Sequence, residues 1–180
     1  MDKQSQRMLE KLQNIRSSDP KNTSQNLIGE KWDKNSSFFC FKNMNMQDIG
    51  KWGELMFEES YGLKSKPTGL DLPSLNADVK TFTRAYKRTK FSGGASEHLN
   101  PDWYFVYLIF PNEYQLYRIP RYDQCIKHPI ANADKGKIDI TSEDIDRFIL
   151  KNYLITDELP IDNASNSTIN LNNGTLGEFF

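Results

Sequence analysis

Residues 46–61 carry the strongest structural pattern in the chain, because their apolar side chains recur at the spacing of an α-helix. At about 100° per residue, one face of this helix collects Met46, Ile49, Gly50, Gly53, Met56, Phe57, Ser60 and Tyr61. Glycines weaken a helix, so the two on this face predict close packing against another element. Trp52 falls on the polar side of the helix and is interpreted as covering an interface.

Strand patterns follow this helix. Along residues 76–82 the side chains alternate between two faces, which carry Ala77, Val79 and Thr81 on one side and Asp78, Lys80 and Phe82 on the other. Residues 102–110 are rich in aromatic and β-branched types, and residues 113–119 alternate again after a turn at Pro111. These last two segments predict a hairpin. A loop is expected over residues 92–96, where two glycines lie between serines.

Helical patterns also stand near both ends of this region. Residues 4–16 have a narrow apolar stripe that could dock on the domain or on a second copy of the chain. Thr141 and the acids after it predict a helix to about Tyr153, with Ile145, Phe148 and Ile149 inward. The expected fold class is α/β (α+β), with a central mixed β-sheet flanked by helices. Three segments are expected. Residues 1–36 form an N-terminal helix and arm with a candidate dimer contact, residues 37–156 form the core, and residues 157–180 form a polar tail.

Composition narrows the classes of protein further. The formal net charge is −1, so nucleic-acid binding requires a local basic patch rather than a global positive field. Two cysteines and two histidines are scattered, which argues against a structural zinc site and favours reduced thiols. The first residues are polar, and no apolar run approaches membrane-spanning length. We therefore expect a cytoplasmic protein with no membrane partner.

The pattern D-x6-D-x-K formed by Asp71, Asp78 and Lys80 carries the clearest chemistry. Residues two apart on a strand point the same way, so Asp78 and Lys80 face a common point, and a tight turn would bring Asp71 beside them. Two carboxylates suit Mg²⁺, which takes one or two protein carboxylates together with water and phosphate oxygens. Glu54, at the edge of the apolar helix face, could support such a site.

Three stretches resemble the PD-(D/E)xK nuclease superfamily, which includes the Type II restriction endonucleases. They are the glutamate-bearing helix segment 49–54, the segment 68–72 with Asp71, and the segment 77–81 with Asp78 and Lys80. Leu70 stands where the superfamily pattern has proline. The resemblance implies a restriction-endonuclease-like core, Mg²⁺ as cofactor and hydrolysis of phosphodiester bonds. It also implies metal binding by Asp71 and Asp78, water activation by Lys80 and support of the site by Glu54.

A basic segment directly follows the predicted strand that carries Asp78 and Lys80, and we expect this segment to contact DNA. A charge run is usually a solvated loop, but this one is well placed to contact phosphates. The expected DNA-binding residues are Arg84, Tyr86, Lys87, Arg88, Lys90, His98 and Asn100. Ser92 and Ser96 are further residues that could reach bases or backbone.

The sequence thus favours a Mg²⁺-dependent endonuclease of double-stranded DNA, of the sequence-specific Type II restriction kind. Short palindromic targets would imply a homodimer. Two alternatives remain open: a repair or junction-resolving nuclease, and a non-catalytic DNA-binding module of the same fold. A third reading, an unrelated α+β binding protein, would leave Asp71 as an ordinary turn residue and Asp78 and Lys80 as an exposed strand face.

Overall fold

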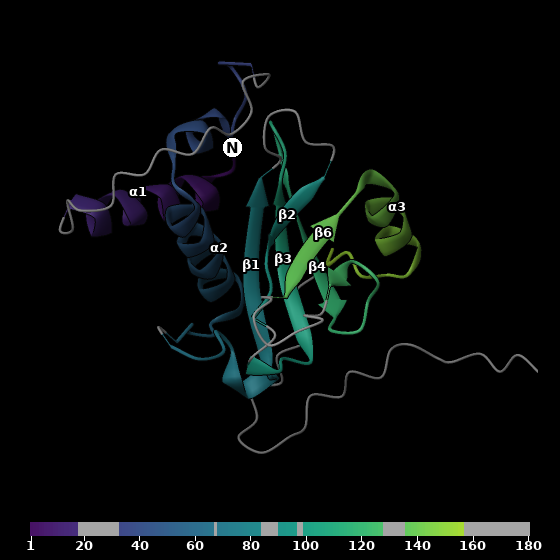
Figure 1. The fold of residues 1–180 in the computed structure, drawn as a ribbon. Coiled ribbons are helices and arrows are strands. Elements are labelled where there is room, and N and C mark those ends of the chain that lie inside the picture. Colours follow the sequence, from purple (N-terminus) through teal and green to yellow (C-terminus); the bar gives the residue numbers. More distant parts are fainter. Residues whose placement is uncertain (18–32, 67, 84–89, 97–98, 128–135, 157–180) are drawn as a thin grey trace, which may run out of the picture.

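Two small β-sheets form the centre of the molecule, with helices beside them (Figure 1). The computed structural model describes residues 1–17, 33–66, 68–83, 90–96, 99–127 and 136–156. The helices are α1 (Lys3–Ser17), α2 (Met46–Tyr61) and α3 (Ser142–Leu150), with short 3-10 turns η1 (Phe39–Asn43) and η2 (Pro73–Leu75). The expected mixture of helices and sheet is confirmed. None of these helices combines the length and the apolar character needed to cross a membrane.

The first sheet contains the three strands that the sequence predicts. Its order is β1-β3-β4, with bounds β1 (Ala77–Thr83), β3 (Trp103–Ile109) and β4 (Tyr114–Pro120). β1 runs parallel to β3, and β3 and β4 form the expected antiparallel hairpin, so this sheet is mixed. Both faces are buried. Ala77 and Val79 pack on the side of α2, whereas Phe82 packs on the opposite side.

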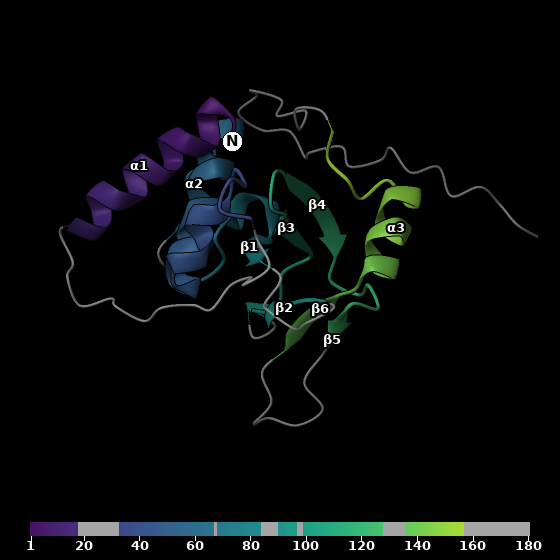
Figure 2. The ribbon, with the colours of Figure 1, turned by 90° about the horizontal axis from the view of Figure 1, so that it is seen from above.

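The second sheet was not expected from the sequence. Its order is β2-β6-β5, all antiparallel, with bounds β2 (Phe91–Gly94), β5 (Ile126–Lys127) and β6 (Lys137–Ile140). The expectation of a loop at residues 92–96 is therefore wrong for the part within β2. Figure 2 shows α1 and α2 on one side of the first sheet, with the second sheet and α3 on the other.

Burial corrects several other expectations. Trp52 does not cover an interface, because it is 0% exposed and its ring meets Phe38, Phe41, Tyr107 and Tyr114 edge-on. α3 ends at Leu150 rather than near Tyr153, and Ile149 is 45% exposed. The apolar stripe of α1 is buried within its own domain through Met8, Leu9 and Leu12, next to α2. The dimer contact at residues 1–36 stays a prediction.

The two glycines of α2 have different surroundings, and this difference supplies a matched test. A Cβ at Gly53 would collide with Thr81 Oγ1 on β1, whereas a Cβ at Gly50 meets nothing within 4 Å. The expectation of close packing is therefore confirmed for Gly53 and wrong for Gly50. We expect Gly53→Ala to lower the free energy of unfolding by ~1–3 kcal/mol through overpacking. Gly50→Ala should raise it by ~0.5–1 kcal/mol through helix propensity.

Urea denaturation of the two variants beside the wild type measures both effects. Equal changes of the same sign in the two variants would contradict the packing of α2 against β1 through Gly53.

Candidate functional site

A tight reversal of the chain brings Asp71 beside Asp78. Leu72 and Ala77 form an antiparallel bridge, in which the two backbone N–H groups donate to the opposite carbonyls at 3.0 and 3.1 Å. η2 and Asn76, which has a φ of 46°, make the turn between them. Since Asp71 precedes one bridge partner and Asp78 follows the other, antiparallel pairing sets the two aspartates opposite each other. The residues between Asp71 and Asp78 in the sequence form this turn.

Asp71 and Asp78 meet at the edge of β1 that does not pair with β3. Asp71 Oδ2 accepts a hydrogen bond of 2.9 Å from the backbone N–H of Val79. Asp78, one residue earlier on β1, is 2% exposed, and Lys80 Nζ lies 2.5 Å from its Oδ2. This contact is an ion pair, and Asp78 Oδ2 accepts no hydrogen bond of ordinary geometry. Lys80 Nζ donates instead to Ser96 Oγ at 2.9 Å.

The two carboxyl groups share one environment and titrate as a pair. Burial, a hydrogen bond with Asp78 and the Asp78 charge raise the pKa of Asp71 from 3.8 to about 8. Burial also acts to raise the pKa of Asp78, but the contacts with Asp71, Lys80 and Ser96 outweigh it and hold that pKa below 3.8. At neutral pH the pair therefore retains one proton. A bound cation could replace this proton.

Glu54 reaches the site only from the side of α2. Its Oε2 accepts hydrogen bonds from Lys51 Nζ at 2.7 Å and from Ser65 Oγ at 3.1 Å. Its negative charge is one of the causes that raise the pKa of Asp71, so the two groups act on each other electrostatically. Ser65 also donates to Glu58 Oε1 at 3.0 Å and was not identified from the sequence, because a lone serine in a polar stretch carries no pattern.

The donor set formed by these residues fits a magnesium ion. Across the described ranges, no three His, Cys, Asp or Glu side chains converge on one point in a way that could hold a metal ion. Asp71 and Asp78 provide two carboxylates that lie together, and Glu54 Oε2 accepts from Lys51 and Ser65. Two carboxylates and several waters are an ordinary protein environment for Mg²⁺, whereas zinc normally takes three or four protein ligands. Asp78 Oδ2 is buried and accepts no hydrogen bond of ordinary geometry, so an ion bound there would take the place beside it that the Lys80 ammonium now holds.

The predicted DNA-binding residues are only partly within the described structure. Five lie outside it: Arg84, Tyr86, Lys87, Arg88 and His98. Lys90 donates to Asp139 Oδ2 at 2.6 Å, and Asn100 is exposed with a φ of 54°. Ser92 donates to Asp139 Oδ1 at 2.6 Å, and Ser96 accepts from Lys80; their contact with DNA stays a prediction.

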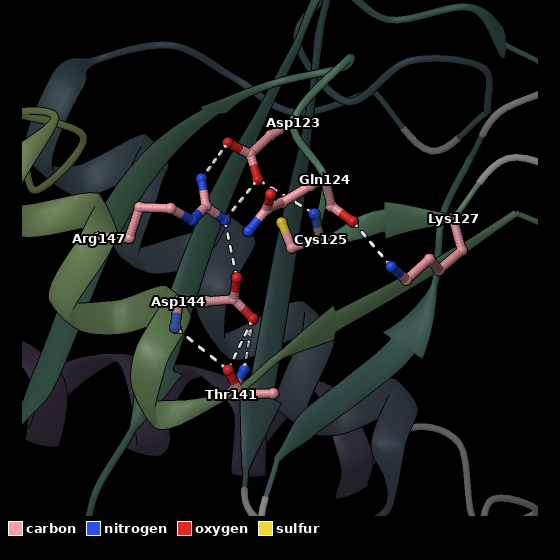
Figure 3. A network of polar contacts seen from close by, with 7 residues as sticks. All are labelled: Asp123, Gln124, Cys125, Lys127, Thr141, Asp144 and Arg147. Atoms are coloured by element: carbon pink, nitrogen blue, oxygen red, sulfur yellow. Dashed lines mark hydrogen bonds and ion pairs between the residues drawn. The ribbon is translucent and has the colours of Figure 1, made fainter.

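A second polar cluster lies between α3 and the segment after β4 and has a structural role (Figure 3). Arg147 donates to both oxygens of Asp123 at 2.6 and 2.8 Å and to Asp144 Oδ1 at 2.8 Å. Asp144 also forms a capping box with Thr141 at the start of α3. Burial raises the pKa of the nearby Cys125 thiol, which argues against a nucleophilic thiolate. This cluster fastens α3 to the segment between β4 and β5.

The raised pKa of Asp71 predicts a pH dependence of stability. Between about pH 4 and pH 8 the carboxyl is ionised in the unfolded chain but still protonated in the folded one. The folded state then binds the extra proton, so the stability that it contributes is present below pH 4 and is lost as the pH rises to about 8. We expect Asp71→Asn to flatten this loss. Urea denaturation of both proteins in EDTA at pH 5 and pH 8 measures it, and parallel losses would contradict the shared proton.

Comparison of the chain with models of known protein families, with curated proteins and with solved structures finds no match.

Proposed function

We propose that this chain is a Mg²⁺-dependent endonuclease that hydrolyses phosphodiester bonds of double-stranded DNA. The observation that carries the proposal is the opposition of Asp71 and Asp78 across the Leu72–Ala77 bridge, with the Lys80 ammonium in contact with Asp78. A restriction-endonuclease-like core belongs to the same proposal. It is supported by the mixed β1-β3-β4 sheet with α2 packed beside the strand that carries Asp78 and Lys80.

The roles of the side chains follow from their positions. Asp71 and Asp78 would hold the ion, which when bound stabilises negative charge on the phosphate and lowers the pKa of a bound water. Lys80 would hold a water molecule or the charge that develops on the phosphate, and Ser96 fixes the direction of its ammonium group. Glu54 supports the site through its negative charge near Asp71.

The experiment is incubation of the purified chain with long linear DNA of diverse sequence and, in parallel, with a four-way junction. Each is run with Mg²⁺ and with EDTA. Discrete bands that need Mg²⁺ are expected, as from a sequence-specific enzyme of the Type II restriction kind. Cleavage of the junction alone would select a junction-resolving nuclease. DNA binding without cleavage of either substrate would overturn the catalytic proposal and favour a DNA-binding module.

Short palindromic cleavage sites would extend the proposal to a homodimer, because two-fold symmetry of the target matches two copies of the chain. Sedimentation of the protein with and without a mapped site measures this.

A further inference from the structure

The side chains on the outer face of the β2-β6-β5 sheet point away from the hydrophobic core. Along β2 and β6, Phe91, Ile138 and Ile140 point inward and are buried. The alternate positions point outward, as the period of two in a strand requires. The residues on this outer face are Ser92, Gly94, Lys127, Lys137 and Asp139.

Among the described residues of the outer face, lysines outnumber acids. Lys127 and Lys137 are directly paired across β5 and β6, and both are exposed. Like charges opposite each other destabilise a sheet. Asp139 only partly offsets the repulsion between the two lysines. Its Oδ1 lies 3.3 Å from Lys137 Nζ, but its Oδ2 also accepts from Lys90 Nζ at 2.6 Å. Lys127 donates to the carbonyl of Gln124 at 2.9 Å (Figure 3). Among the described residues, Lys90 and Lys137 thus share the Asp139 carboxylate.

Gly94 stands beside this lysine pair, and nothing in the described part of the fold requires a glycine there. It pairs with Lys137 in the sheet, it is exposed, and a Cβ built on it meets nothing within 4 Å. Its φ is not positive. By contrast, a Cβ at Gly93 would collide with the ring of Phe82. A glycine in a strand with open space above it leaves the backbone accessible to an approaching ligand.

The outer face leads directly to the candidate site. Ala95 donates to the carbonyl of Gly136 at 2.8 Å, which extends the β2–β6 pairing by one residue. The next residue, Ser96, accepts the hydrogen bond from Lys80. The paired positions Gly94, Lys137 and Lys127 therefore begin two residues away from the partner of Lys80.

We propose that this face binds the sugar-phosphate backbone of duplex DNA, with Lys127 and Lys137 on phosphates and the strand passing close over Gly94. The proposal rests on the proposed function, since it assigns a docking surface to the same substrate. The excess of lysines matches the charge of the phosphates, and the missing side chain at position 94 leaves room for the backbone. Lys90, expected from the sequence to contact DNA, belongs to the same surface through Asp139.

The test is equilibrium binding of a fluorescent duplex in EDTA, which prevents cleavage, over a range of salt concentrations. The variants are K127Q with K137Q, and separately Gly94→Val. The matched control is K3Q with K11Q, which removes two exposed lysines from α1 on the other side of the first sheet. We expect the slope of log K against log salt to fall by about 2 for the double variant of the outer face.

Gly94→Val should weaken binding while leaving that slope nearly unchanged, because it blocks approach without removing charge. Its stability should be unchanged or higher, since valine favours a strand and the position is open. Binding by both variants equal to that of the wild type would overturn the docking surface and leave the nuclease proposal standing. Binding that depends on these residues in a protein that cleaves no DNA would support the surface while the catalytic proposal fails. A wild type that binds no DNA would overturn both.

Discussion

Asp78→Asn should lower the rate of Mg²⁺-dependent DNA cleavage by ~10³-fold or more, because an amide oxygen holds a cation far less strongly than a carboxylate does. A metal ion contributes several kcal/mol of charge stabilisation at a phosphate, and 1.36 kcal/mol corresponds to a tenfold change in rate at about 25 °C. Asp78 is also the group in contact with Lys80, so the substitution disturbs both components of the site. The measurement is the single-turnover rate of cleavage at saturating Mg²⁺.

The control for this variant is Asp146→Asn, which removes an exposed carboxylate from α3 at a distance from β1. It should cleave at the wild-type rate. Circular dichroism and thermal unfolding of both variants show whether the fold is retained, since Asp78 is buried and its loss leaves the Lys80 ammonium with one partner fewer. Cleavage by a folded Asp78→Asn protein at the wild-type rate would contradict the assigned role of Asp78.

Trp52→Ala should lower the free energy of unfolding by ~3–5 kcal/mol, the range for removal of a large buried aromatic side chain. The Trp52 ring is 0% exposed and lies 5.1 Å from the ring of Phe41, 5.8 Å from that of Tyr107 and 5.7 Å from that of Tyr114, centre to centre. It therefore joins α2 to the segment before it and to both strands of the hairpin. Small domains have a total stability of ~5–15 kcal/mol, so this loss is a large share of it.

Urea denaturation followed by circular dichroism measures the change. Trp52→Phe is the matched variant, because it keeps an aromatic ring in the cavity and should lose much less stability. An alanine variant as stable as the wild type would show that Trp52 lies on the surface, as its place on the polar side of the helix had suggested.

The error over Trp52 has a physical cause that the sequence does not reveal. A helical wheel separates one apolar face from one polar face, which is correct for a helix with a single neighbour. α2 instead packs against the first sheet through Gly53 and is also covered by α1 and by Phe38 and Phe41. Two separate sides of the helix are therefore buried.

The long, strongly patterned elements could be predicted, whereas the second sheet could not. α2 and the three strands of the first sheet carry clear periods in their side chains. β2 contains two glycines, β5 has two residues, and β6 pairs with a strand more than 40 positions earlier in the sequence. Short strands whose pairing is long-range have no local signal, because their stability comes from the neighbours that they find in the fold.

The candidate site likewise has one part that the sequence predicts and another part that it does not. The turn between Asp71 and Asp78 is local, so the spacing of the two residues in the sequence predicts that they lie side by side. The contacts of Ser65 with Glu54 and of Ser96 with Lys80 join residues 11 and 16 positions apart in the sequence. They depend on how helix, loop and strand meet, which residue patterns do not specify.

The claim on which the proposed chemistry depends is that Asp71 and Asp78 together hold a divalent cation. Binding of Mn²⁺ in place of Mg²⁺, followed by electron paramagnetic resonance of the free ion, tests this claim without DNA and without activity. We expect the wild type to bind one Mn²⁺ that Mg²⁺ displaces, and the variant with both Asp71→Asn and Asp78→Asn to lose this binding. Equal binding of Mn²⁺ by the two proteins, or none by the wild type, would contradict the assignment of the metal site.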